Sequence, residues 1–235
     1  MVGSSYHHEH GINMIRAVFF DLDGTLYDRD ATILRMAEEQ FEAFRDELGV
    51  EKSVFLERLV ELDGHGQPRT HRLHHVLAES LGLGVAVGDK LEAYFRSHYP
   101  DLCSLSTQDL ATLETLRERG KKLGLITNGP TEWQSRKIEC MGLTPLFDAV
   151  VISEAEGVRK PDPRIFERAL ERCGVRADES MFVGDHPEID IQGAVGAGLV
   201  PVWKAAPYWQ VPDHILRIDQ LSELLPLLDG GAPFA

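Results

Sequence analysis

The order of hydrophobic and polar positions divides the chain into three parts. A short apolar run at 17–20 predicts a strand buried on both faces, because it contains no polar position that could face water. Residues 30–102 show apolar side chains at helical spacing and no strand pattern, which predicts a helical segment of about seventy residues. From residue 105 onward, short apolar runs alternate with amphipathic stretches, which predicts alternating strands and helices.

The amphipathic stretches of 30–102 predict four helices, at 30–48, 53–62, 70–81 and 87–99. In the rest of the chain we expect helices at 108–119, 132–141, 163–173, 189–197 and 221–228, strands at 122–127, 149–152, 181–183 and 199–203, and a loop at 205–212. Strands that alternate with helices of this length form a parallel sheet through right-handed crossovers. The predicted fold is therefore α/β, with a Rossmann-like parallel sheet core and an inserted all-helical cap domain.

The same pattern predicts the domain boundaries. The α/β core is expected at 14–29 and 103–235, and the helical cap at 30–102. Residues 1–13 are rich in histidine and precede Met14, a plausible original start. We therefore expect them to be a disordered leader or a tag.

Composition narrows the class of protein. The chain has 235 residues, 43% of them hydrophobic and 26% charged, as in soluble globular proteins. Its net charge of −14 argues against nucleic acid or an anionic membrane as a partner. No apolar run approaches the ~18 residues of a membrane span. The three cysteines are scattered, which favours free thiols and a cytoplasmic location.

Two carboxylates directly follow the first apolar run. Asp21 and Asp23 are two residues apart, so in extended chain they point to the same side just past the strand. Gly24 permits a sharp turn, and Thr25 offers a hydroxyl to brace the loop. Ligands bind at the carboxyl ends of parallel strands, and two close carboxylates favour a hard cation such as Mg²⁺. Asp21 titrates near pH 4 when free, so it is ionised and suited to nucleophilic attack.

An acidic surface turn or a calcium loop are the alternative interpretations of these two aspartates. An EF-hand loop that starts at Asp21 requires glycine at its sixth position and glutamate at its twelfth. The sequence has Leu26 and Thr32 there, which excludes this calcium loop.

Polar residues also follow or flank three later elements. Thr127, Asn128 and Gly129 come at the end of the strand expected at 122–127 and offer donors suited to phosphate oxygens. Lys160 precedes the helix expected at 163–173 and would by default be a solvated lysine. Two more carboxylates follow the strand at 181–183, and together the strand ends gather Asp21, Asp23, Asp185 and Asp190. Such a cluster is costly alone, and Mg²⁺ with Lys160 would neutralise much of it.

Two other patterns have weaker functional interpretations. Gly193, Gly196 and Gly198 do not match the dinucleotide-binding fingerprint, so we attribute them to close packing of a helix on the sheet. His71 and His75 share a face of a predicted cap helix with His74 nearby, but no glutamate stands between them as a zinc protease requires. We expect these histidines to be solvated or to face substrate.

Taken in order, these motifs resemble those of the haloacid dehalogenase-like (HAD) hydrolases. They are Asp-Leu-Asp-Gly-Thr-Leu at 21–26, Thr127-Asn128, Lys160-Pro161-Asp162, and Gly184-Asp185 with Asp190. The resemblance covers the core from residue 15 to about 203, and the helical insert is similar to the cap of members whose cap follows the first motif.

The resemblance implies a role for each matched residue. Asp21 would be the nucleophile and Asp23 the general acid/base. Thr127 would bind the transferring phosphoryl group, and Lys160 would bind both nucleophile and phosphate. The metal ion would be held by Asp21, Asp185 and the backbone carbonyl of Asp23, with support from Asp190.

From these observations we expect a Mg²⁺-dependent phosphatase of a small phosphorylated metabolite. Asn128, Gly129 and, in the cap loop at 63–69, Arg69 are further candidates for substrate binding, because Arg69 could pair with a second anion. Alternatives are a 2-haloacid dehalogenase, a phosphomutase, and a non-catalytic phospho-ligand-binding protein. Asp23 argues against the dehalogenase, which needs no acid for a halide. The pattern indicates no particular oligomeric state.

Overall fold

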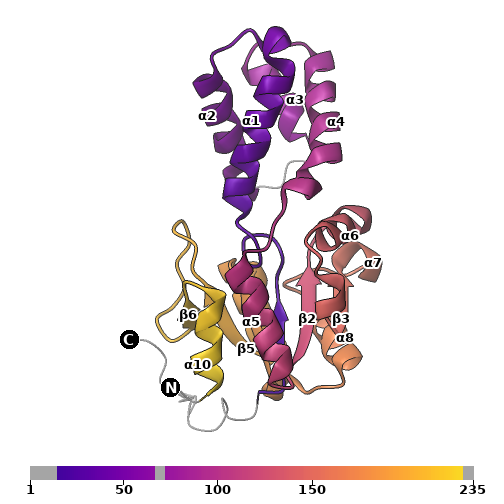
Figure 1. The fold of residues 1–235 in the computed structure, drawn as a ribbon, viewed down its shortest axis with the longest axis vertical. Helices are drawn as coiled ribbons and strands as arrows, with labels where there is room; N and C mark the ends of the chain where they lie inside the picture. The colour runs from indigo at the N-terminus through magenta and orange to yellow at the C-terminus, as the bar shows by residue number, and fades with distance from the viewer. Residues whose placement is uncertain (1–14, 67–71, 230–235) are drawn as a thin grey trace, which may run out of the picture. The chain divides into compact units, whose positions relative to one another are not determined.

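The computed structural model describes residues 15–66 and 72–229, which form two compact units (Figure 1). Within these residues, the core unit comprises the chain up to Tyr27 and from Leu105 onward, and the cap unit comprises Asp28–Ser104. The leader expected at 1–13 lies outside the described residues. None of the described helices is both long and apolar enough to cross a membrane.

The core unit is built on a six-stranded parallel sheet with the order β3-β2-β1-β4-β5-β6. Its strands are β1 (Ala17–Phe20), β2 (Lys122–Thr127), β3 (Ala149–Ile152), β4 (Ser180–Gly184), β5 (Val200–Lys204) and β6 (Leu216–Ile218). The predicted Rossmann-like parallel sheet is confirmed. The sequence did not predict β6, because three residues are too few to show a strand pattern.

The central position of β1 decides where its aspartates lie. Phe20 pairs in register with Leu125 of β2 on one side and with Val183 of β4 on the other. The carboxyl ends of β1, β2 and β4 therefore lie side by side at one edge of the sheet. Segments that follow these three strands are brought together there, although more than 150 residues separate the first from the last.

Helices of the core unit precede, connect and follow the strands. They are α5 (Thr107–Glu118), α6 (Thr131–Cys140), α7 (Ser153–Glu156), α8 (Pro163–Cys173), α9 (Gly193–Gly196) and α10 (Leu224–Leu228). Figure 1 shows α5 and α10 in front of the strands. The helix expected at 189–197 is instead a π-helix, η5 (Pro187–Gln192), followed by the single turn of α9.

The hydrophobic core on one face of the sheet is formed by α8 and α9 and by β1, β2, β3 and β4. Phe166 of α8 packs edge-to-face on Phe182 of β4, with ring centroids 5.1 Å apart. Phe19 of β1 lies over Gly124 of β2, where a Cβ atom would come within 2.2 Å of the Phe19 ring. Gly124 is therefore needed for Phe19 to lie over β2, and this packing fixes the strand that Asp21 follows.

The cap unit contains four helices, α1 (Arg29–Leu48), α2 (Lys52–Asp63), α3 (Leu73–Ser80) and α4 (Val85–Leu102). The Asp28 side chain begins α1 by accepting a hydrogen bond from the amide of Ala31 at 2.9 Å. The expectation that His74 is solvated or faces substrate is wrong. Its side chain is 1% exposed and lies between Gln40 and Glu92 in the cap interior.

Candidate active site

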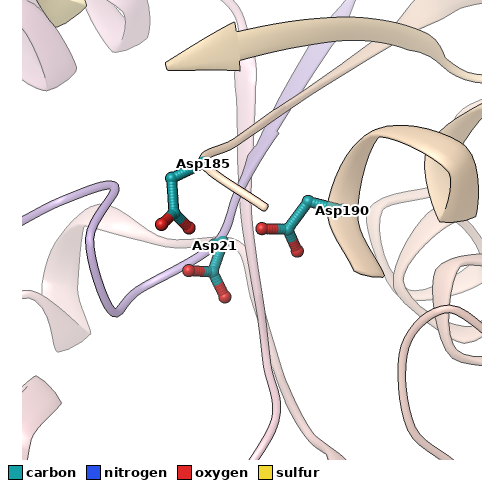
Figure 2. Close-up of side chains that lie close together, drawn as sticks. All are labelled: Asp21, Asp185 and Asp190. Carbon is teal, nitrogen blue, oxygen red and sulfur yellow. The ribbon is translucent and has the colours of Figure 1, made fainter. Parts of the chain in front are cut away.

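Three carboxylates gather where β1 and β4 end. Asp21 follows β1, Asp185 follows β4, and Asp190 lies on η5, as Figure 2 shows. One oxygen of each lies within 4.8 Å of the others. The amide of Asp21 donates to the carbonyl of Val183 at 2.9 Å, so the pairing of β1 with β4 continues to the aspartate itself. The position of this carboxylate is therefore set by the sheet.

Glycines allow the loops around these carboxylates to approach closely. Gly24 has φ +87°, and a Cβ atom there would lie 2.7 Å from Oδ2 of Asp185. At Gly184, a Cβ atom would lie 2.4 Å from the Cβ of Asp190. The turn after β1 and the end of β4 therefore both require glycine for Asp185 and Asp190 to enter the cluster.

Asp190 reaches the cluster because η5 is a π-helix. The amide of Ile191 donates to the carbonyl of His186, five residues earlier, at 3.2 Å. A π turn holds one residue more than an α turn and commonly marks functional sites. Oδ2 of Asp190 accepts the amide of His186 at 3.1 Å, which leaves Oδ1 directed at Lys160.

Lys160 supplies the positive charge of the cluster. Its Nζ atom lies 2.5 Å from Oδ1 of Asp21 and 2.7 Å from Oδ1 of Asp190, and the residue is 2% exposed. Burial alone would lower the pKa of Lys160, but Asp190 and Asp21 outweigh it and hold this pKa above its ordinary value. Lys160 is a buried ion-paired cation, so the default of a solvated lysine does not apply.

Asn128 fixes the backbone of Lys160. Its side-chain amide donates to the carbonyl of Lys160 at 3.0 Å and accepts the amide of Lys160 at 2.9 Å. This pair of hydrogen bonds ties the segment after β2 to the loop before α8. Asn128 therefore holds Lys160 in place, and contact of Asn128 with substrate stays a prediction.

The three carboxylates outnumber the one ammonium group, and the pKa values of Asp21 and Asp185 reflect this. Burial, together with Asp190 and Asp23, raises the pKa of Asp21 to about 7 against the opposing effect of Lys160. Burial, Asp190 and Asp21 raise the pKa of Asp185 well above its ordinary range. A bound divalent cation would reverse both shifts, because it stabilises the ionised carboxylates. Three converging carboxylates are an oxygen-rich donor set that fits Mg²⁺.

Asp23 belongs to a different hydrogen-bond network. Its Oδ1 atom accepts from Nζ of Lys137 at 2.5 Å and from the hydroxyl of Tyr27. Its Oδ2 atom accepts from Nε2 of Gln134 at 2.9 Å. Burial alone would raise the pKa of Asp23, but Lys137, Tyr27 and Gln134 outweigh it and hold this pKa far below its ordinary value.

Separate networks thus hold the two aspartates of the first motif, and Asp23 directs its side chain to Lys137. The resemblance to HAD hydrolases assigns the backbone carbonyl of Asp23 to the metal ion, and that assignment stays a prediction. Thr25 does not brace the loop through its hydroxyl, which is buried without a hydrogen-bond partner. The amide of Leu26 closes the turn instead, by donating to the carbonyl of Leu22 at 3.0 Å.

Sequence reasoning missed Gln134 and Lys137, which are among the buried residues of α6. They are three positions apart and so share one helix face. A signal for them exists in the sequence, since two polar side chains occupy the face of a helix that should pack on the sheet. Lys137 is 3% exposed, and its Nζ lies 5.8 Å from the ring centre of Tyr27 and 6.0 Å from that of Trp133.

Two predicted phosphate-binding residues lie beside this network. Thr127 is fully buried, and its Oγ1 atom accepts a hydrogen bond from Nε2 of Gln134. The amide of Gly129 donates to Oγ of Ser153 at 3.0 Å, so that amide is already engaged. Binding of substrate by Thr127 and Gly129 stays a prediction.

In the cap, Arg69 and His71 lie outside the described residues. The neighbouring His65 is described, and its Nδ1 atom lies 2.7 Å from Oδ2 of Asp30. Asp63 binds Arg29 through two hydrogen bonds of 2.6 and 2.8 Å. The start of the loop at 63–69 is therefore tied to the first turn of α1.

Comparison with known proteins places the chain in a family. Residues 15–198 match the family described as haloacid dehalogenase-like hydrolase. Glyceraldehyde 3-phosphate phosphatase from Methanopyrus kandleri is 37% identical, over 92% of this chain and 97% of its own length. Pyrimidine 5'-nucleotidase YjjG from Escherichia coli is 33% identical, over 90% of this chain and 96% of its own.

Among solved structures, the HAD phosphatase from Thermococcus onnurineus has a TM-score of 0.66 and 29% sequence identity. That similarity covers 94% of this chain and 100% of the other. The family match extends from β1 through the segment that carries Asp185 and Asp190, so it includes all the strand ends described above. The chain therefore belongs to the haloacid dehalogenase-like hydrolases.

Proposed function

We propose that the protein is a Mg²⁺-dependent phosphatase that hydrolyses a small phosphorylated metabolite through an aspartyl-phosphate on Asp21. One observation carries the proposal. Asp21 lies in the carboxylate cluster with Lys160, whereas Asp23 has its own set of donors in Lys137, Tyr27 and Gln134. A phosphatase needs both a nucleophile and a separate acid/base, and the two aspartates lie in separate hydrogen-bond networks.

In the first half-reaction, Asp21 attacks phosphorus and forms the aspartyl-phosphate while the ester P–O bond breaks. For this step Asp23 must take up a proton against the effect of Lys137, Tyr27 and Gln134, which favour its carboxylate form. It gives that proton to the leaving oxygen, which departs as an alcohol. Lys160 contacts Asp21 and would therefore lie beside the phosphoryl group whose phosphorus atom Asp21 attacks. It neutralises charge on the transferring group, together with the hydroxyl of Thr127.

In the second half-reaction, Asp23 is a carboxylate and accepts a proton from water. The water oxygen bonds to phosphorus, the bond from phosphorus to Asp21 breaks, and inorganic phosphate leaves. Asp21 is again a carboxylate and Asp23 is again protonated, so the cycle closes. The donors around Asp23 stabilise its carboxylate form, which is the form that activates water.

Asp21, Asp185 and Asp190 would hold or support the metal ion, with the backbone carbonyl of Asp23 as a further ligand. Bound Mg²⁺ would supply a Lewis acid that offsets the negative charge of the carboxylates and of the phosphoryl group. The raised pKa values of Asp21 and Asp185 support this assignment, because they express a shortage of positive charge in the cluster.

The names of the relatives support the proposed substrate class. They are named as phosphatases of glyceraldehyde 3-phosphate and of pyrimidine 5'-nucleotides, and both are small phosphorylated metabolites. Within the described residues no disulfide joins the three cysteines, which supports a reducing, cytoplasmic location. We assign substrate selection to the cap, because the core residues described above all serve the phosphoryl group or the nucleophile.

A direct test compares phosphate release with halide release. The purified protein with Mg²⁺ should release phosphate from 4-nitrophenyl phosphate and from members of a panel of phosphorylated metabolites. It should release no halide from 2-chloropropionate, and excess EDTA should abolish activity until Mg²⁺ is restored. Halide release that persists in EDTA would establish the dehalogenase instead. Transfer of phosphate to a second sugar hydroxyl without net hydrolysis would establish the phosphomutase.

A further inference from the structure

Gln134 joins two groups to which the proposed function gives different tasks. Its Nε2 atom donates to Oδ2 of Asp23 at 2.9 Å and also to Oγ1 of Thr127. Gln134 is 1% exposed and lies on α6, seven residues beyond Thr127 and 111 beyond Asp23. A single amide nitrogen therefore connects the acid/base to the hydroxyl that receives the phosphoryl group.

The chemistry of the carboxylate decides which way this amide faces. An ionised carboxylate can only accept hydrogen bonds, so the amide nitrogen must face Asp23. That nitrogen carries two hydrogens, and the second one is directed to Thr127. The oxygen of Thr127 is then the acceptor in this bond, and its own hydrogen must point elsewhere. No hydrogen bond donated by the Thr127 hydroxyl occurs among the described residues.

We propose that Gln134 is a positioning residue that holds the Thr127 hydroxyl as a donor to the phosphoryl group and Asp23 in line with the leaving oxygen. This inference rests on the proposed function. By occupying the lone-pair side of Thr127, Gln134 leaves the hydroxyl hydrogen to the incoming phosphoryl oxygens. By binding Oδ2 of Asp23, it fixes the rotation of that carboxylate, whose other oxygen is bound by Lys137.

The fold holds Gln134 in this position. Its backbone amide donates to the carbonyl of Pro130 at 3.0 Å, within the first turns of α6. Its side chain packs on Gly129, where a Cβ atom would lie 2.9 Å from Cγ of Gln134. Gly129 thus leaves room for the side chain to pass from α6 to the end of β2, which explains a glycine at this position better than substrate contact does.

A second interpretation is that Gln134 only ties α6 to the sheet. The two interpretations differ in their kinetic consequences. Loss of a structural tie lowers stability, and it changes kcat/KM by the same factor for all substrates. Loss of a positioning residue lowers kcat/KM for every phosphate ester through its effect on Thr127. Through its effect on Asp23, the loss lowers kcat/KM only for esters whose leaving oxygen needs a proton.

The test uses two variants. Gln134→Leu removes both hydrogen bonds that the side-chain amide donates and keeps a side chain of similar size, and Gln134→Glu keeps the shape of the side chain. In Gln134→Glu, the introduced carboxylate accepts the Thr127 hydroxyl hydrogen and repels Asp23. We expect kcat/KM for 4-nitrophenyl phosphate to fall about tenfold or more in Gln134→Leu and further in Gln134→Glu. Ile138→Val, on the same helix and 3% exposed, is the control and should stay within about twofold.

A double-mutant cycle with Thr127→Val separates the effect of Gln134 on Thr127 from its effect on Asp23. With an aryl phosphate, whose leaving group needs no acid, adding Gln134→Leu to Thr127→Val should cost less than about threefold. With an alkyl phosphate, adding Gln134→Leu to Thr127→Val should still lower kcat/KM about tenfold, because the effect of Gln134 on Asp23 remains. Melting temperatures of all variants show whether they are folded.

Several results would overturn the inference. Gln134→Leu with kcat/KM near that of the wild type would do so, as would losses that multiply fully with Thr127→Val for the aryl phosphate. Equal losses for aryl and alkyl phosphates would contradict the role at Asp23, because only that role depends on the leaving group. Failure of the proposed function looks different, since the wild-type protein would then release no phosphate, or Asp21→Asn would remain active.

Discussion

The Nζ atom of Lys137 lies 2.5 Å from Oδ1 of Asp23, in an ion pair that joins α6 to the loop after β1. The side chain of Lys137 is 4% exposed and that of Asp23 is 14% exposed. Breaking a pair with so little access to water leaves one charge without compensation. The position of Asp23 therefore depends on a helix that begins more than 100 residues after it.

Lys137→Met should lower both activity and stability. Asp23 loses its charged donor, so we expect turnover to fall about 10- to 100-fold and the free energy of unfolding to fall by about 2–4 kcal/mol. Steady-state kinetics and urea unfolding measure the two effects. Lys137→Arg keeps the charge and should retain most of the stability. If Lys137→Met is as active as the wild type, the ion pair has no part in positioning Asp23.

Asp21→Asn should remove the nucleophile while keeping its shape. We expect turnover of 4-nitrophenyl phosphate to fall at least ~10³-fold, because the covalent route is lost. Asp219→Asn is the matched control, since Asp219 is an exposed aspartate paired with Arg217. Near-wild-type turnover by Asp21→Asn, with deamidation back to aspartate excluded by mass spectrometry, would refute the assignment of the nucleophile.

Asp185→Asn should have opposite effects on stability with and without Mg²⁺. The raised pKa of Asp185 shows that its charged form is disfavoured by burial and by Asp190 and Asp21 in the metal-free cluster. Removing this charge should raise the melting temperature in EDTA. It should also abolish most of the rise that Mg²⁺ produces in the wild type, since that rise measures metal affinity.

Calorimetric titration with Mg²⁺ provides a second measurement for the same variant, and we expect affinity to fall at least tenfold. An unchanged Mg²⁺ affinity in Asp185→Asn would show that the metal ion binds elsewhere.

The cap loop at 63–69 should influence substrate choice. Alanine at His65 and at Arg69 should change the ranking of substrates in a metabolite panel, while hydrolysis of 4-nitrophenyl phosphate stays within about threefold. Arg58→Ala is the control, because Arg58 is a cap cation paired with Glu61 on α2. If both loop variants keep the wild-type ranking, another part of the cap selects the substrate.

Glu92→Gln should weaken the cap unit in a pH-dependent way. The hydrogen bond from His74, with help from Arg96, lowers the pKa of Glu92 from 4.5 to about 2. A carboxylate with a lowered pKa contributes stability above its unfolded pKa and loses that contribution as pH falls toward the folded value.

Allowing for solvent screening at this partly exposed group, we expect Glu92→Gln to cost about 1–2 kcal/mol at pH 7. The difference from the wild type should shrink steadily between pH 4.5 and 2. Urea unfolding followed by circular dichroism at several pH values measures it, with Glu61→Gln as the exposed control. A difference that is constant across this range would show that the charge of Glu92 is not responsible.

Much of the fold could be read from local pattern. The strands at 122–127 and 149–152 and the helix at 163–173 have the predicted bounds, because each is an uninterrupted run whose period is set by its own residues. β6 and η5 could not be predicted. The three residues of β6 are too few to show a periodic pattern. The π turn of η5 depends on how Asp190 packs against Gly184.

The residue types of the site were also evident from the sequence. Asp21, Lys160, Asp185 and Asp190 each stand beside a predicted strand end or helix start, where a parallel sheet collects ligands. Sequence alone therefore determined the α/β class and the carboxylates at one sheet edge, and from these carboxylates it predicted a bound cation.

Only the tertiary structure decided which side chains act together. It gave Asp23 a network separate from that of Asp21, although the two are neighbours in the chain, and it made Asn128 a support for Lys160. It also brought Gln134 and Lys137 to Asp23, across 111 and 114 residues. Hydrogen bonds and ion pairs form between groups close in space, and this closeness arises from strand order and helix packing, which the local period of a sequence does not contain.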